Sequence, residues 1–157
     1  MIKKILVAIE YDDTSNDVFK QAITLAQALH AQLNLINVST PREDISFSFS
    51  PYSDQDWRLY AETYREGKMA SFKLLERLAE QAKATGIEAE CAQAIGSPGP
   101  AICQLAKSWG ADLLMVGSHG RRGFSEMLLG SVSNYVVHHA TCSVMVVHEP
   151  DRADAGD

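Results

Sequence analysis

The sequence contains no long hydrophobic run, no surplus of basic residues and few cysteines. Its longest apolar runs are about five or six residues, whereas a membrane-spanning helix needs about 20, so we expect no membrane span. The N-terminus passes directly into an apolar run of strand length, without the apolar core of a signal peptide, and we therefore expect a cytoplasmic protein. The net charge of −6 leaves no basic surplus to displace counterions from a phosphate backbone. This argues against non-specific nucleic-acid binding.

The three cysteines, Cys91, Cys103 and Cys142, are odd in number and widely spaced, and they form no Cys-x-x-Cys pair. This pattern favours reduced, packed thiols. The paired histidines His138 and His139 precede Cys142, but no other ligand cluster accompanies them, and histidines near a helix end are favoured by the helix dipole. We expect no metal site made by protein side chains alone.

What the sequence does contain is typical of a globular protein. Its 157 residues, 46% of them apolar, are enough for one domain with a substantial core. We expect a single domain over residues 1–148 and a polar, frayed tail over 149–157.

Strand-length apolar runs alternate with helical stripes along the chain. The runs cover residues 2–9, 33–38, 87–91, 112–116 and 143–147, and the stripes cover 18–29, 57–85, 102–109 and 132–140. Gly86 and Gly110 stand where the second and third helices should end. Because each helix returns the chain to the same end of the sheet, the alternation predicts an α/β fold with a doubly wound, five-stranded parallel sheet. The expected order is 3-2-1-4-5, a Rossmann-like arrangement.

The segment over about residues 40–55 has no clear periodicity. It contains two prolines, several serines and scattered aromatic residues. Loops of this length are uncommon in compact domains and tend to be mobile or functional. We expect a mobile loop here, which is either a surface insertion, a lid over a site or a contact for a partner.

Glycines and small polar residues follow the fourth expected strand. They are spaced Gly117-x2-Gly120-x9-Gly130-Ser131, with a new helical stripe after the last pair. Glycine lets backbone amides approach a bound oxygen, and the first amides of a helix have no intrahelical acceptor. The segment therefore predicts a phosphate site. Its spacing matches neither the Walker pattern nor the dinucleotide G-x-G-x-x-G pattern.

This spacing resembles the nucleotide-binding motif of the universal stress protein family, in its ATP-binding subgroup. The resemblance covers nearly the whole chain, and several matching features occur in the same order. They are Ile5 to Ile9, Gly96-Ser97-Pro98-Gly99, Ala111 to Gly120 and Cys142 to Val147. The chain differs from the family's usual Asp-Gly-Ser after the first strand, where it has Glu10-Tyr11-Asp12.

The resemblance implies a purine nucleotide, usually ATP, with AMP or ADP as alternatives and Mg²⁺ held through the phosphates. The base would lie near Ala8, Ile9 and Val38, and the ribose near Glu10. Val116 and Ser118 would flank the phosphate segment. The phosphates would meet Gly117, His119, Gly120, Gly130, Ser131, Val132 and Ser133.

We assign no catalytic residue. His119 has no partner recognisable from spacing that would orient it as a base, and we expect its backbone amide to contact phosphate. Ser131 and Ser133 are not in a G-x-S-x-G elbow, which favours a role in phosphate binding over a nucleophilic one.

Three functions fit these residues. The leading hypothesis is an ATP-binding stress-response regulator, a dimeric switch or adaptor read by an unknown protein partner. The second is a slow Mg²⁺-dependent ATPase or transferase that uses Glu10 or Asp12 for the metal and Arg121 or Arg122 for charge. The third is a dimeric interaction module that no longer binds nucleotide.

The fifth strand, Ser143 to Val147, should lie at an edge of the sheet. Its exposed backbone and apolar side chains would be covered by a second copy. We therefore expect a two-fold homodimer through this strand, which the family resemblance also implies.

Overall fold

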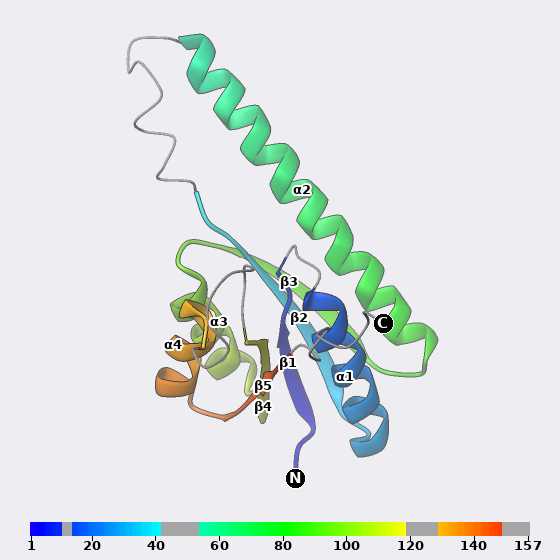
Figure 1. Ribbon diagram of the computed structural model, residues 1–157. Helices are drawn as coiled ribbons and strands as arrows, with labels where there is room; N and C mark the ends of the chain where they lie inside the picture. Colours follow the sequence, from blue (N-terminus) through cyan, green and yellow to red (C-terminus); the bar gives the residue numbers. More distant parts are fainter. Residues whose placement is uncertain (11–13, 42–53, 119–128, 149–157) are drawn as a thin grey trace, which may run out of the picture.

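The computed structural model describes residues 1–10, 14–41, 54–118 and 129–148 (Figure 1). The chain forms five strands and four helices in these ranges. In order they are β1 (Lys4–Ala8), α1 (Thr14–Leu29), β2 (Gln32–Ser39), α2 (Asp54–Ala84), β3 (Ala89–Ile95), α3 (Pro98–Trp109), β4 (Leu113–Gly117), α4 (Ser131–His139) and β5 (Ser143–Val147). All paired strands are parallel, and the order is β3-β2-β1-β4-β5. The predicted fold class and strand order are confirmed.

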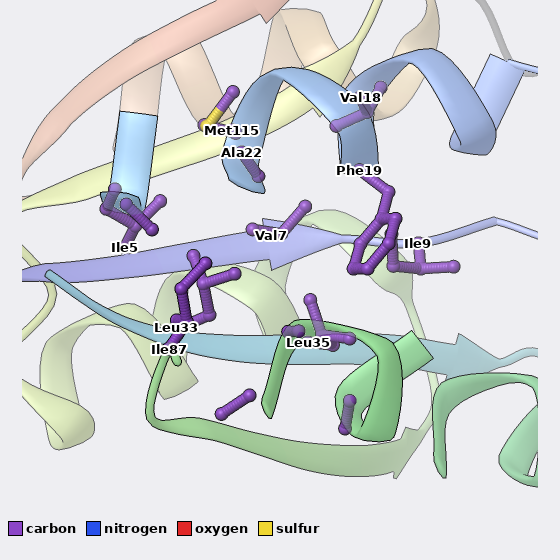
Figure 2. Packing of buried hydrophobic residues seen from close by; sticks show 14 of the residues in the cluster. Ile5, Val7, Ile9, Val18, Phe19, Ala22, Leu33, Leu35, Ile87 and Met115 are labelled. Carbon is purple, nitrogen blue, oxygen red and sulfur yellow. The ribbon is translucent and has the colours of Figure 1, made fainter. Parts of the chain in front are cut away.

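Alternation along β1 divides the core into two layers. Ile5 and Val7 belong to the layer that also contains Phe19 of α1 and Leu75 of α2 (Figure 2). Leu6 and Ala8 face the other way, toward α3 and α4. Successive side chains of a strand point to opposite faces, so a central strand between two helical layers must be apolar throughout.

Helix α2 has 31 residues and is much longer than the strands, which have 5–8. Its C-terminal half carries Leu75, Ala79 and Ala82 into the α1 and α2 layer. Its N-terminal half projects past the ends of the strands (Figure 1) and leaves Trp57 exposed. The helix ends where predicted, because Gly86 adopts a positive φ of 86° just beyond it. Gly110 closes α3 in the same way.

Strand β3 is longer than the sequence indicated. We expected it over 87–91, but it extends to Ile95 and pairs with β2 as far as Ser39. Ala92, Gln93 and Ala94 have weak strand propensity, and pairing with β2 extends the strand here. β3 lies at an edge of the sheet, as the predicted strand order requires.

Several predictions concern residues outside the described ranges. The polar tail lies there, as does most of the expected loop over 40–55, although α2 already begins at Asp54. None of the helices within the described residues is long and apolar enough to cross a membrane.

Candidate functional site

The order of the strands reverses between β1 and β4. These central strands are paired, Val7 opposite Met115, and their carboxyl ends lie side by side. The connection after β1 leads to α1 on one face, whereas the connection after β4 leads to α4 on the other. Such a switch point is the usual place for a ligand in an open α/β sheet.

The backbone just after β1 is held by two hydrogen bonds to β2. The N–H of Ile9 donates to Ile36 O at 2.8 Å. The buried side chain of Asn37 donates through Nδ2 to Ile9 O at 2.9 Å. Both polar groups of the Ile9 backbone are therefore fixed, and this sets where the chain turns toward Glu10, which is half-buried. We did not predict the role of Asn37; the only signal was a polar residue within an apolar strand.

Ser118, the first residue after β4, is hydrogen-bonded to the start of α4. Its side chain is 3% exposed, and its N–H donates to Val147 O at 2.9 Å. Its carbonyl accepts from the N–H of Gly130 at 2.7 Å and from Ser133 Oγ at 3.2 Å. The start of α4 is thereby tied to the end of β4.

Helix α4 begins without a side-chain cap. Gly130 is its N-cap residue, in an extended conformation, and the first helical hydrogen bond runs from the N–H of Asn134 to Gly130 O. The amides of Ser131, Val132 and Ser133 precede that bond and have no acceptor within the helix. An uncapped helix start beside a strand end provides donors for an anion.

Helix α3 also begins at this edge and lies on the same face as α4. Its first and third residues are Pro98 and Pro100, which have no backbone N–H. Gly99 keeps its N–H, whereas the N–H of Ala101 already bonds Ser97 O at 3.2 Å. Of these two neighbouring helix starts, α4 therefore retains far more donors for a ligand.

The predicted base-contacting residues divide between the two faces. Ala8 and Val38 belong to the α3 and α4 layer, the side on which the first turn of α4 lies. The side chain of Ile9 packs into the opposite layer and is buried. Only the backbone of Ile9 is therefore available to a ligand on the α4 side.

The structure brings most of the predicted site residues to one edge. β1 and β4 end there with Ala8 and Gly117, and α4 begins there with Ser131. Ser131 is exposed, whereas Ser133 is 2% exposed and its hydroxyl also bonds Gly130 O at 3.0 Å. The predicted contacts of His119 and Gly120 lie outside the described residues, as do Tyr11, Asp12, Arg121 and Arg122.

The three cysteines are free and half-buried. Burial is the largest influence on each thiol and raises the pKa of Cys91, Cys103 and Cys142. A raised pKa keeps a thiol protonated and unreactive. Among the residues that the structure describes, no three His, Cys, Asp or Glu side chains gather as metal ligands would.

Known proteins resemble this chain over nearly its whole length. The model of the universal stress protein family matches residues 1–148. The chain is 34% identical to universal stress protein Sll1388 of Synechocystis, over 92% of this chain and 96% of that protein. It is 35% identical to universal stress protein YxiE of Bacillus subtilis, over 94% and 99%.

Solved structures share the fold. Universal stress protein UspA from Lactobacillus plantarum superposes with a TM-score of 0.77 at 21% identity, covering 93% of this chain and 97% of that one. A universal stress protein in complex with cAMP superposes with a TM-score of 0.67 at 25% identity, over 94% and 97%. An Arabidopsis thaliana family member with AMP bound gives a TM-score of 0.66 at 21% identity, over 95% and 93%.

Proposed function

The chain belongs to the universal stress protein family, and from this premise we propose that it is a regulatory protein that binds ATP at the carboxyl edge of its sheet. Family members crystallised with cAMP and with AMP support an adenine nucleotide as the ligand class. The regulatory role requires that ATP binds two conformations of the protein with different affinity. A partner protein would then recognise the favoured conformation.

One observation carries the proposal. The uncapped start of α4 is held beside the end of β4 by two hydrogen bonds to the carbonyl of Ser118. This fixes in position the amides of Ser131, Val132 and Ser133, which have no acceptor within the helix. Preorganised donors bind an anion without an ordering cost at the time of binding.

The other contacts follow from this placement of the phosphates. The base lies along Ala8 and Val38, with the backbone of Ile9, and the carboxylate of Glu10 meets the ribose hydroxyls. Val116 and Gly117 lead to the phosphates. The buried hydroxyl of Ser133 orients α4, whereas the exposed hydroxyl of Ser131 is free to reach a phosphate oxygen. Mg²⁺ would be held through the phosphates.

The side chains at the carboxyl edge of the sheet are better suited to binding ATP than to hydrolysing it. The described residues contribute mainly backbone donors and hydroxyls, and the Ser133 hydroxyl bonds carbonyl groups rather than a base. We expect phosphate release at the background rate with and without Mg²⁺. A faster release that Glu10→Ala abolishes would instead identify a slow ATPase.

Substitution by proline tests the amide donors directly. Ser131 is the first residue of α4, where proline is tolerated, and Gly130 has the extended conformation (φ −61°, ψ 166°) that precedes proline readily. Ser131→Pro therefore removes one donor while preserving the helix. Loss of one hydrogen bond to a charged group costs about 1.5–3 kcal/mol, so we expect ATP affinity to fall roughly 10- to 150-fold in calorimetry.

The matched control is Ser131→Ala, which removes the hydroxyl but keeps the amide, and we expect a smaller loss. Equal ATP affinity in the parent protein and in folded Ser131→Pro would contradict the placement of the phosphates. An absence of any nucleotide released from the denatured protein, together with no calorimetric binding, would favour the interaction module.

We also propose a homodimer through β5. This edge strand carries half-buried Val144, Met145 and Val146, and a two-fold axis would pair it antiparallel with its copy. Analytical ultracentrifugation at micromolar concentration should give a dimer. A monomer at all concentrations would refute this interface.

A further inference from the structure

Gly99 and Tyr135 are in direct contact between α3 and α4. Gly99 is buried, and a Cβ atom built on it would lie 2.6 Å from Cδ1, 2.7 Å from Cγ and 3.0 Å from Cβ of Tyr135. Carbon atoms in proteins do not approach so closely without a shift. The Tyr135 side chain therefore occupies the space that any other residue at position 99 would need.

The Tyr135 ring is also held by its own helix. It stacks on the ring of His139, with centroids 4.0 Å apart and planes at 10°. His139 Nδ1 donates to Tyr135 O, one helical turn earlier, at 2.8 Å. The Tyr135 ring thus has little freedom to move away from an added methyl group at position 99.

Helix α4 buries Val136 in the core and makes two further contacts with the body. Its first turn bonds Ser118 through the N–H of Gly130 and the hydroxyl of Ser133. Its middle packs Tyr135 against the backbone of Gly99. The Tyr135 contact lies one turn beyond the first, so the two contacts together set the direction of the helix axis.

We propose that Gly99 and Tyr135 are positioning residues for the phosphate site. Their contact sets how α4 lies against α3. It thereby orients the amides at the start of α4, which are those of Ser131, Val132 and Ser133. This inference rests on the function proposed above. Neither residue touches the nucleotide. Their effect is transmitted through the orientation of α4.

The test is Gly99→Ala, which forces Tyr135 and α4 away from α3. We expect ATP affinity to fall about tenfold, because misdirected donors lose part of their hydrogen-bond energy. The matched control is Gly67→Ala, a helical glycine of α2 around which an added Cβ meets nothing within 4 Å. It should bind ATP as the parent protein does.

A double variant distinguishes an effect of the Gly99–Tyr135 contact from a general disturbance of the fold. Tyr135→Ala removes the ring that an alanine at position 99 would strike. Adding Gly99→Ala to Tyr135→Ala should cost little further affinity, because residues in direct contact have non-additive effects. Additive losses would overturn the proposal.

Hydrogen exchange of the ligand-free protein provides a readout that does not depend on nucleotide. In Gly99→Ala, the amides of Gly130 and Asn134 should lose protection, whereas the amide of Ile9, bonded to Ile36 O, should keep it. Equal loss at all three amides, or unchanged protection with unchanged affinity, would refute the positioning role. If the parent protein binds no nucleotide, the proposed function fails, and the exchange data still decide whether the contact orients α4.

Discussion

The two ends of the sheet use their polar groups in opposite ways. At the amino end, the carboxylate of Asp112 accepts the backbone N–H groups of Lys3 and Lys4 at 2.8 and 2.9 Å. The lysine ammonium groups donate to the last carbonyls of two helices, Lys3 to Leu29 O and Lys4 to Trp109 O. Lys4 also lies 5.2 Å from the centre of the Trp109 ring. Here the helix ends are satisfied by the protein itself.

At the carboxyl end, the helix that follows β4 has no side-chain cap. The interactions there fix backbone groups in position, as Asn37 does for Ile9 and Ser118 does for Gly130. The amides at the start of α4 have no acceptor within the helix, and these are the donors that we propose for the nucleotide phosphates. If the carboxyl end binds nucleotide as proposed, substitutions at the two ends of the sheet should affect different measurements: stability at the amino end and ATP affinity at the carboxyl end.

The largest effect should come from Gly130→Val at the carboxyl end. A branched side chain at the N-cap obstructs the approach of an anion to more than one amide, and we expect ATP affinity to fall roughly 100-fold or more. Valine is a poor N-cap, so stability should fall by about 1 kcal/mol. The control is Gly67→Val, the same change in open surroundings. Unchanged affinity in a folded Gly130→Val protein would remove α4 from the site.

Asn37→Leu should have the next largest effect, on stability. The substitution leaves the carbonyl of Ile9 without its side-chain donor in a buried place, which costs about 1–3 kcal/mol. Urea denaturation should show the loss as a lower midpoint. If stability is unchanged, the hydrogen bond does not hold the turn after β1.

The layers and strand order could be predicted from local patterns. The apolar residues of β1 and β4 fill both faces of a strand, which indicates a central position, and glycines stand where α2 and α3 end. Such signals need no knowledge of distant residues. The weak strand formers at 92–94 were missed because their conformation depends on pairing with β2.

The candidate site was predictable only in part, for the same reason. Glycine spacing is the basis of the predicted phosphate segment, which stays a prediction, and Ser131 in it is exposed. The hydroxyl of Ser133, however, bonds the carbonyl of Ser118, 15 residues away. Asn37 holds a carbonyl 28 residues away. Neither partner can be identified without the fold.

Asn34→Leu should change stability in the opposite direction from Asn37→Leu. Both asparagines lie on β2, but Asn34 Oδ1 is buried and has no hydrogen-bond partner within the described part of the chain. Replacing a side chain whose buried oxygen has no partner with an apolar group of similar size removes the desolvation cost of that oxygen, and we expect a gain of about 1 kcal/mol. A loss of stability in urea denaturation would show that Asn34 is satisfied in solution.

The smallest effect should come from Asp112→Asn at the amino end, and it should depend on pH. The backbone N–H groups of Lys3 and then Lys4 lower the pKa of Asp112 from its ordinary 3.8. A lowered folded-state pKa stabilises the protein above the unfolded value, and this contribution is lost as pH falls through the folded value. The parent protein should therefore be more stable than Asp112→Asn at pH 7, and the difference should shrink below about pH 4.

ATP affinity at pH 7 should be the same in both, because Asp112 precedes β4 and lies at the end of the sheet opposite the start of α4. A fall in affinity with Asp112→Asn would mean that the two ends of the sheet are coupled, and a stability difference that is constant with pH would mean that the charge of Asp112 does not contribute.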